Sequence, residues 1–568
     1  MKVSDYIVDF FIKKEISDVF GYPGGMVTHL MESFSNRKNE IKAHVNYHEQ
    51  ASAFAACGYA QVSGKAGVAY ATSGPGATNL ITGIANAWFD SIPTIFITGQ
   101  VNTFETRDKF GIRQNGFQET DIVSMVKGIT KYCTYISRVE DIRYELEKAW
   151  YYANEGRKGP VLLDIPMNVQ RGQIEVEKLE SFCTLEIEKL GKKYELDAFQ
   201  KMLKKAKRPV ILVGAGVKSA NAEQIFQKVV EKWNIPVVSS MISFDVLDYN
   251  HSNFYGFVGA YGQRCANFII AKSDLVIAMG SRLGIRQTGG KVENFAPEAE
   301  LVRIDIDSNE FSKKIKENEL DIECDIKEFL GVVEKKDIQF SDLKEWIDVC
   351  KIIKKKLKDI DTGEENRIIQ KFSNRLPEDI VITTDVGQNQ VWVAQAFQTK
   401  KKHRVLFSGG HGAMGYSLPA AIGAYYGSRV PVLCFNGDGG IQMNIQELQF
   451  IARERIPITI VILNNSALGM IRHFQEMYFN SNFFQTLECG GYSTPEFQKI
   501  ANAYGLDYCK ISKEDEVEEI KLDINKPQII EICLQNHTYV FPKLEYGMPN
   551  QDQHPLIERE LYNYIMQL

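Results

Sequence analysis

The chain has 568 residues, of which 44% are hydrophobic, 24% charged and 11% aromatic, a composition typical of globular proteins and unlike that of disordered or fibrous ones. The net charge is −6 and no long basic block occurs, which argues against binding of nucleic acid. No apolar run approaches the ~18 residues that a membrane span needs. The 10 cysteines contain no CxxC pair, so zinc or a disulfide framework is not expected. We expect a cytoplasmic protein with about three or four domains.

The N-terminal region reads as part of the mature fold. Val3, Ile7, Phe10 and Phe11 have helical spacing and acidic residues come early, which predicts an amphipathic helix and not a signal peptide. Short apolar runs then alternate with helical patterns, as is typical of α/β domains with parallel sheets. The buried strands predicted here are 67–72, 94–98 and 161–165.

Two charged stretches divide the rest of the chain. One is 175–193 and the other is 351–358. The block between them opens with RPVILVGAGVKSA and continues through SDLVIAMGSR and AELVRIDID, and the last block carries DIVITTD, VPVLCFNGDGG and ITIVILNN. The prediction is three doubly wound α/β domains over 1–180, 190–345 and 365–545, followed by a C-terminal tail, 546–568.

One βαβ unit in the last block carries the strongest chemical signal. Strand 432–435 ends in GDG, a helical pattern over 445–453 follows, and strand 458–463 ends in NN. Parallel strands joined by a crossover helix end at the same edge of the sheet, where open α/β folds bind ligands. A GDG or an NN sequence taken alone is more often a plain turn than part of a ligand site. Together, Asp438 and Asn465 present a carboxylate and an amide oxygen, which suit Mg²⁺.

The spacing of these turns is similar to the thiamin diphosphate signature, in which NN follows GDG by about 25 residues; here 27 positions separate Asp438 from Asn465. The N-terminal HEQASAFAACGYA closely resembles the pyrimidine-binding domain of acetohydroxyacid (acetolactate) synthases. The motifs GYPGG, SGPGATN, FQE and GGHGAMGYSLPAAIGA extend the resemblance over nearly the whole chain. It implies pyrimidine-binding, central and diphosphate-binding domains, in that order.

The resemblance assigns catalytic roles to three residues. Glu49 is the activating glutamate that protonates N1′ of the cofactor's pyrimidine, so that the 4′-imine can remove the proton from thiazolium C2. Gly412 offers its carbonyl to the 4′-amino group, and Met414 forces the cofactor into its bent shape. Without the resemblance, Glu49 would be interpreted only as a charge at a helix N-terminus, and Met414 only as a residue of the hydrophobic core.

The resemblance also implies the cofactor and metal ligands. Asp438, Asn465 and the carbonyl of Ala467 hold Mg²⁺. The other cofactor-binding residues implied are Gly25, Thr72, Gly74, Asn79, Gly437, Gly439, Gly440, Leu468, Gly469 and Met470. In this family one cofactor lies between domains of two subunits, which implies a homodimer or a dimer of dimers. A need for a regulatory subunit stays open.

The expected acceptor pocket departs from the family pattern. GSRLGIRQTG resembles the family's G-x-R-F-D-D-R-V-T-G, and by position Arg286 is the clamp for a substrate carboxylate, with a structural salt bridge as the alternative. Phe474 replaces a tryptophan and Ala260 a methionine, so the pocket is expected to be wider. Phe117, Gln118 and Lys131 still match family pocket positions.

These residues predict a thiamin diphosphate-dependent carboligase that decarboxylates a 2-keto acid, pyruvate being the expected donor, and transfers the acyl carbanion to a carbonyl acceptor. The alternatives are transfer to a larger acceptor such as a nucleotide-linked keto-sugar, a keto-acid decarboxylase or 2-hydroxyacyl lyase, and a non-enzymatic paralogue. The absence of an HH pair counts against a decarboxylase. Many relatives bind FAD in the central domain, but Gly284 and Ile285 replace the acidic pair here, which leaves FAD open.

Overall fold

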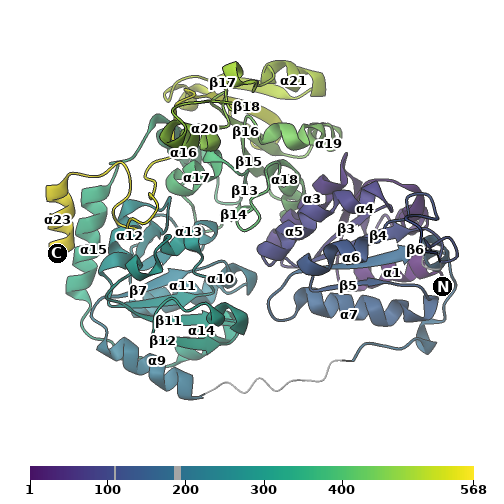
Figure 1. The fold of residues 1–568 in the computed structure, drawn as a ribbon, viewed down its shortest axis with the longest axis horizontal. Coiled ribbons are helices and arrows are strands. Elements are labelled where there is room, and N and C mark those ends of the chain that lie inside the picture. The colour runs from purple at the N-terminus through teal and green to yellow at the C-terminus, as the bar shows by residue number, and fades with distance from the viewer. Residues whose placement is uncertain (108–109, 184–192) are drawn as a thin grey trace.

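The computed structural model describes residues 1–107, 110–183 and 193–568. Three six-stranded sheets, parallel throughout, form three α/β domains grouped around a common centre (Figure 1). This confirms the predicted fold class. Part of the predicted connector, residues 184–192, lies outside the described residues. Within the described ranges, no helix is long and apolar enough to cross a membrane.

The first domain has the strand order β2-β1-β3-β4-β6-β5. Its predicted N-terminal helix is present, with Val3, Ile7 and Phe11 fully buried. The elements are α1 (Val3–Lys13), β1 (Asp18–Gly21), α2 (Thr28–Asn36), β2 (Lys42–Val45), α3 (Glu49–Ser63), β3 (Gly67–Ala71), α4 (Pro75–Asn79), α5 (Ile81–Phe89), β4 (Thr94–Gln100), α6 (Ile122–Val126), β5 (Tyr132–Tyr135), α7 (Ile142–Asn154), β6 (Pro160–Pro166) and α8 (Met167–Gln170).

The middle domain has the order β12-β11-β10-β7-β8-β9. Its elements are α9 (Lys193–Lys205), β7 (Pro209–Val213), α10 (Gly216–Ser219), α11 (Glu223–Trp233), β8 (Val237–Ser239), β9 (Phe254–Phe257), α12 (Arg264–Lys272), β10 (Leu275–Met279), α13 (Ile285–Thr288), β11 (Glu300–Asp305), β12 (Glu319–Glu323), α14 (Ile326–Lys335) and α15 (Lys344–Leu357). The tail ends in α23 (Arg559–Gln567), whose Ile565 is buried in the same core cluster as Trp346 and Phe268. The end of the chain therefore packs on the middle domain.

The third domain has the order β14-β13-β15-β16-β18-β17. Its elements are α16 (Glu364–Arg375), β13 (Val381–Thr384), α17 (Gln388–Ala396), β14 (Arg404–Leu406), α18 (Ser417–Ser428), β15 (Val432–Gly437), α19 (Leu448–Glu454), β16 (Ile458–Asn464), α20 (Gly469–Tyr478), α21 (Phe497–Tyr504), β17 (Asp507–Ile511), α22 (Glu516–Glu519) and β18 (Gln528–Cys533).

The predicted helix over 445–453 was wrong at its start. A 3-10 helix, η9 (Ile441–Glu447), precedes α19 and is interrupted at Asn444, where φ is −135° and ψ is 30°. The Asn444 amide donates to the carbonyl oxygen of Gly415 (2.8 Å) and to Oε1 of Gln50 (3.1 Å). These tertiary bonds hold Asn444, one residue before the predicted start, outside the helical conformation, and the α-helix begins only at Leu448.

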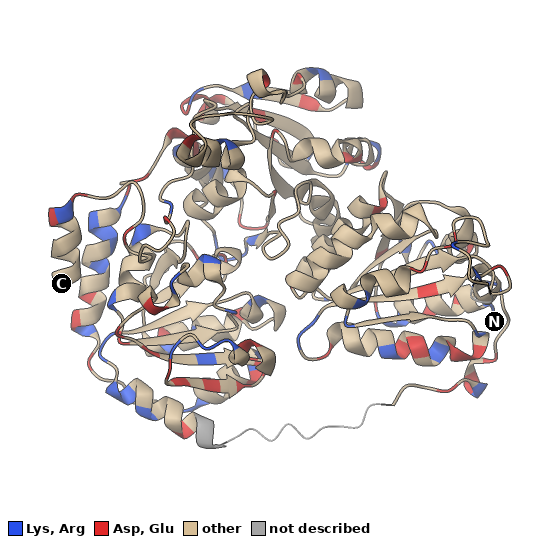
Figure 2. Cartoon of the chain, viewed as in Figure 1, with Lys and Arg blue, Asp and Glu red and all other residues tan. Residues whose placement is uncertain are grey.

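The first and third domains meet along two helices of small residues. Glu49 is the only charged residue of α3, and α18 has none. Figure 2 shows α3 and α5 almost free of charged residues. A Cβ on Gly58 of α3 would lie 2.1 Å from the carbonyl oxygen of Ala420 in α18, so a glycine is required for this approach of the two backbones.

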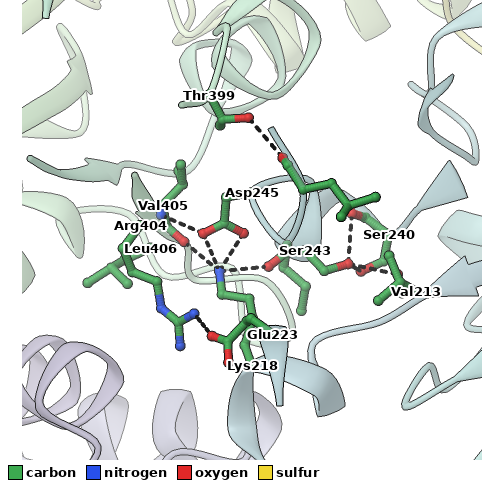
Figure 3. A network of polar contacts seen from close by, with 12 residues as sticks. Val213, Lys218, Glu223, Ser240, Ser243, Asp245, Thr399, Arg404, Val405 and Leu406 are labelled. Atoms are coloured by element: carbon green, nitrogen blue, oxygen red, sulfur yellow. Dashed lines mark hydrogen bonds and ion pairs between the residues drawn. The ribbon is translucent and has the colours of Figure 1, made fainter. Parts of the chain in front are cut away.

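A buried ion pair ties the middle domain to the third (Figure 3). The Lys218 ammonium donates to both carboxylate oxygens of Asp245 (2.8 Å each) and to the carbonyl oxygen of Val405 in β14 (3.0 Å). The amide of Val405 donates in turn to Asp245 (2.7 Å). Edge strand β14 is therefore held by side chains of another domain.

Replacing Lys218 with methionine should lower the free energy of unfolding by about 3–5 kcal/mol, because Asp245 would keep a buried charge without its cation. The control is Lys205→Met, which removes an exposed pair with Glu300 and should cost at most about 1 kcal/mol. Urea denaturation followed by tryptophan fluorescence compares the two. Equal losses would contradict a special role for the buried pair.

Candidate cofactor and metal site

Asp438 and Asn465 meet at the carboxyl edge of the third sheet. β15 and β16 are parallel with Gly437 opposite Leu463, so the residues that follow them lie side by side, as the βαβ argument predicts. Asp438 is 3% exposed and Asn465 4%. The loop after β16 folds back, and the amide of Ala467 donates to Oδ2 of Asp438 (3.1 Å).

The donor set at this edge fits Mg²⁺. The Asn465 side-chain nitrogen donates to Oε1 of Gln388 (2.9 Å), and Gln388 donates to the carbonyl of Thr538 (2.9 Å). That orientation leaves the Asn465 amide oxygen for a ligand. One carboxylate, one amide oxygen and the Ala467 carbonyl are hard oxygen donors. In the part of the chain that the structure describes, no group of three or more His, Cys, Asp or Glu side chains is arranged to hold a metal ion.

The electrostatics of Asp438 favour a bound cation. Burial raises the pKa of its carboxyl to about 6, although the Tyr492 hydroxyl (3.2 Å) and backbone amides stabilise the charged form. Because desolvation outweighs these hydrogen bonds, a bound cation would stabilise the charged carboxylate.

The loop between β14 and α18 brings Met414 to the GDG turn. The Met414 methyl lies 3.5 Å from the position that a Cβ on Gly439 would take, and the Leu468 side chain lies 2.7 Å from that position. Gly412 has a φ of +71°, and apart from its chain neighbours no heavy atom of the described residues lies within 4 Å of its Cβ position. The Gly412 backbone therefore faces open space beside a methionine that contacts the GDG turn.

Two carboxylates hold this loop, the buried Asp385 and the half-buried Asp90. Asp385, which follows β13, accepts the amides of Gly415 and Tyr416 (3.0 Å each). Asp90, which follows α5 in the first domain, accepts the amides of Gly409 (2.9 Å) and Gly410 (2.7 Å). Burial raises the pKa of each carboxyl to about 6.

Glu49 lies in the first turn of α3, at the centre of a second cluster. It is 9% exposed, and its Oε2 accepts the Asn79 amide (2.9 Å). A Cβ on Gly76 would lie 3.3 Å from Oε1 of Glu49, and one on Gly74 would lie 2.9 Å from Gln118. Gly24 packs on Thr72, so the motifs GYPGG, SGPGATN and FQE converge around Glu49.

The start of α3 is fixed by the third domain of the same chain. The buried Glu447 carboxylate accepts the Tyr47 amide (2.7 Å) and the Asn46 side chain (2.9 Å), just before Glu49. Burial raises the pKa of Glu447 to about 7. Glu49 is therefore positioned by a residue outside its own domain.

The predicted acceptor residues divide between a cavity and exposed surfaces. The Arg286 guanidinium lies 5.9 Å from the Tyr261 ring centroid, and among the described residues it has no salt-bridge partner. The Ala260 amide donates to the Arg286 carbonyl (2.8 Å). Phe117 and Phe474 are exposed, by 80% and 49%.

A cavity of about 520 Å³ lies where the three domains meet. Its lining residues include Asp90, Glu155, Gly216, Arg282, Arg286, Asp305 and Gly409. Lys131 donates to the carbonyl of Glu155 (2.6 Å), and desolvation lowers the pKa of its ammonium to about 8. Arg286 therefore lines this cavity, whereas Lys131 reaches it only through its bond to Glu155, which also lines it.

Sequence reasoning missed several residues of the site. Asp385 and Gln388 follow β13, the neighbour of β15, so the sheet-edge argument applied to DIVITTD would have indicated them. Tyr492 lies far from any strand end, and its loop carries no signal that points to Asp438. Asp90 and Glu447 act between domains, which no local pattern reveals.

Comparisons with known proteins agree with this geometry. Residues 1–125, 196–333 and 385–542 match the N-terminal TPP binding domain, the central domain and the C-terminal TPP binding domain of thiamine pyrophosphate enzymes. The chain is 32% identical to the acetolactate synthase isozyme 2 large subunit of Escherichia coli, over 97% of this chain and 99% of that protein. It is 34% identical to the Lactococcus lactis acetolactate synthase large subunit and to the probable one of Methanocaldococcus jannaschii, over 94% of this chain and 92% of each relative. The chain therefore belongs to the acetolactate synthase-like family of thiamine pyrophosphate enzymes.

Proposed function

We propose that this enzyme is a carboligase that uses thiamin diphosphate and Mg²⁺, with pyruvate as the donor and a 2-keto acid as the acceptor. The meeting of Asp438 with Ala467 and Asn465, with Met414 against the same turn, carries the proposal. Two pyruvates and one proton would give acetolactate and carbon dioxide. The bond from the keto carbon to its carboxylate breaks, that carbon bonds to the acceptor carbonyl carbon, and the acceptor oxygen takes the proton.

The side chains have separate tasks in this scheme. When bound, thiamin diphosphate supplies the nucleophilic carbon and the electron sink for decarboxylation. Asp438, Asn465 and the Ala467 carbonyl would hold Mg²⁺. Glu49 would hold a proton at the pyrimidine N1′, and its bond from Asn79 fixes the direction of its carboxyl group. Met414 would support the bound cofactor.

The active unit that we propose is a homodimer, or a dimer of dimers, in which two subunits share each cofactor. The Glu49 cluster belongs to the first domain and the Asp438 cluster to the third. Both domains expose large apolar side chains that a second copy would cover. These are Phe104, Phe110, Ile112 and Phe117 in the first domain and Ile471, Phe474, Tyr478, Phe479 and Phe484 in the third.

FAD is the ligand that we propose for the three-domain cavity. Its volume of about 520 Å³ is in the range of cofactor sites. Arg282 suits a diphosphate, and Asp305 ends strand β11, where α/β folds bind a ribose. Gly214 and Gly216 form a tight turn in its wall.

Proton NMR of a mixture of enzyme, thiamin diphosphate, Mg²⁺ and pyruvate should show acetolactate accumulating. Glu49→Gln should keep cofactor affinity and lose about 10²–10⁴-fold in turnover, because it removes a proton-transfer group. Isothermal titration with the cofactor is the control for folding. Acetaldehyde in place of acetolactate would identify a decarboxylase. No product from pyruvate alone would call for a screen of larger acceptors such as nucleotide-linked keto-sugars.

Mixing two inactive variants tests the shared site. Glu49→Gln and Asp438→Ala should each be inactive alone, but a mixture should regain part of the activity, because a mixed dimer has one site with both native residues. The regained activity should track the dimer fraction in analytical ultracentrifugation. A mixture that exchanges subunits and stays inactive would place both residues of each site in one chain.

The purified enzyme should be yellow and show flavin absorbance. Arg282→Ala should lose the flavin more readily on dialysis, because it removes a phosphate partner, whereas the exposed Lys205→Met should retain it. A colourless protein that takes up no added FAD, measured by flavin fluorescence quenching, would overturn the FAD assignment. If ADP stabilised that colourless protein against unfolding, the cavity would still be a nucleotide-binding site.

A further inference from the structure

The tail forms a closed loop beside the predicted acceptor residues. Lys543 and His554 pair as an antiparallel bridge, with amide-to-carbonyl distances of 2.9 and 2.7 Å. Residues 543–554, named here the tail loop, are therefore joined at the base. The loop packs on the middle-domain segments that contain Ala260 and Arg286.

Hydrogen bonds connect the tail loop to the backbone of both segments. The Leu544 amide donates to the carbonyl of Ala260 (2.7 Å), whose own amide donates to the carbonyl of Arg286 (2.8 Å). Asn550, 3% exposed, donates its side-chain amide to the carbonyl of Gln287 (2.7 Å). The positions of Ala260 and Arg286 therefore depend on each other and on the tail loop.

Close packing reinforces these bonds. A Cβ on Gly290 would lie 2.9 Å from the ring of Tyr546, and one on Gly289 would lie 2.9 Å from Oδ1 of Asn550. The buried Gln553 side chain donates to the carbonyl of Gly262, two residues after Ala260 (2.9 Å). The tail loop therefore leaves no space for either segment to move toward it.

The same part of the tail also contacts α20, which carries Phe474. Lys543 Nζ lies 3.2 Å from the sulfur of Met477. Just before the tail loop, the Tyr539 ring stacks on His473 of α20, with centroids 4.0 Å apart and an interplanar angle of 11°. The tail loop thus contacts the elements that carry Ala260, Arg286 and Phe474.

Arg286 needs such support. It lies on α13, a helix of only 4 residues, its side chain is exposed, and it has no salt bridge among the described residues. A helix this short has little stability of its own. Two of its carbonyls, those of Arg286 and Gln287, are instead fixed by bonds that lead to the tail loop.

We propose that the tail loop is a specificity-determining element for the acceptor, with Asn550 as the positioning residue that sets where Arg286 meets a substrate carboxylate. This rests on the proposed carboligase function. The tail loop acts on the second carbonyl substrate, and decarboxylation of the donor does not depend on it. A misplacement of about 1 Å in a binding group can cost about a hundredfold in rate.

Asn550→Ala should raise the KM for the acceptor by about tenfold to a hundredfold. The probe is 2-ketobutyrate titrated at fixed pyruvate, with the acetohydroxybutyrate measured by proton NMR. Single-turnover release of carbon dioxide from carboxyl-labelled pyruvate should keep the wild-type rate. The control is Glu560→Gln, an exposed change on α23. An unchanged acceptor KM, or an equal loss in both half-reactions, would overturn the proposal.

A second pair of variants tests the proposal if Asn550→Ala does not fold. Gly290→Ala should raise the acceptor KM, because its Cβ meets the Tyr546 ring, and Gly290→Ala combined with Tyr546→Ala should restore it by removing that ring. Failure of the second change to restore the KM would contradict the positioning role. Wild-type enzyme that joins neither pyruvate nor 2-ketobutyrate would contradict the carboligase function itself, which distinguishes the two failures.

Discussion

The segment that leads from β14 to α18 is held by bonds from all three domains, and the cofactor site depends on that arrangement. The Lys218 and Asp245 pair fixes Val405, Asp90 fixes Gly409 and Gly410, and Asp385 fixes the start of α18. Carboxylates that accept backbone amides from within the protein are costly to bury and strongly directional. Together these bonds place the Met414 methyl group 3.5 Å from the position that a Cβ on Gly439 of the GDG turn would take.

The same principle fixes the opposite side of the site. Glu49 begins a helix whose approach is fixed by Glu447 of another domain, and α3 packs on α18 through glycines. The side chains that we propose as catalytic are therefore set by domain packing, so a change at Asp90, Asp385 or Glu447 should act on a bound cofactor without touching it. A second subunit would complete two sites that are already shaped within each chain.

The acceptor side is built differently from the cofactor side. Buried charges hold the cofactor residues, whereas Arg286 lies on a short exposed helix whose backbone is bonded to Ala260 and Asn550. Under the proposed function, changes in the tail and α20 would alter the acceptor while leaving Asp438 and Glu49 in place. The smaller residues at positions 260 and 474 agree with a pocket adapted in this way.

The sequence alone determined the three parallel sheets, since apolar strand runs alternate with helical patterns, and it determined the pairing of Asp438 with Asn465, because one βαβ unit carries both. By resemblance it also indicated Glu49, Gly412 and Met414. Tertiary structure alone decided the break at Asn444, the bonds of Asp90 and Glu447 between domains, and the place of the tail beside Arg286. Local spacing reports which face of a helix or which edge of a sheet a residue occupies. Contacts between residues hundreds of positions apart depend on how whole domains pack, and no short pattern records that.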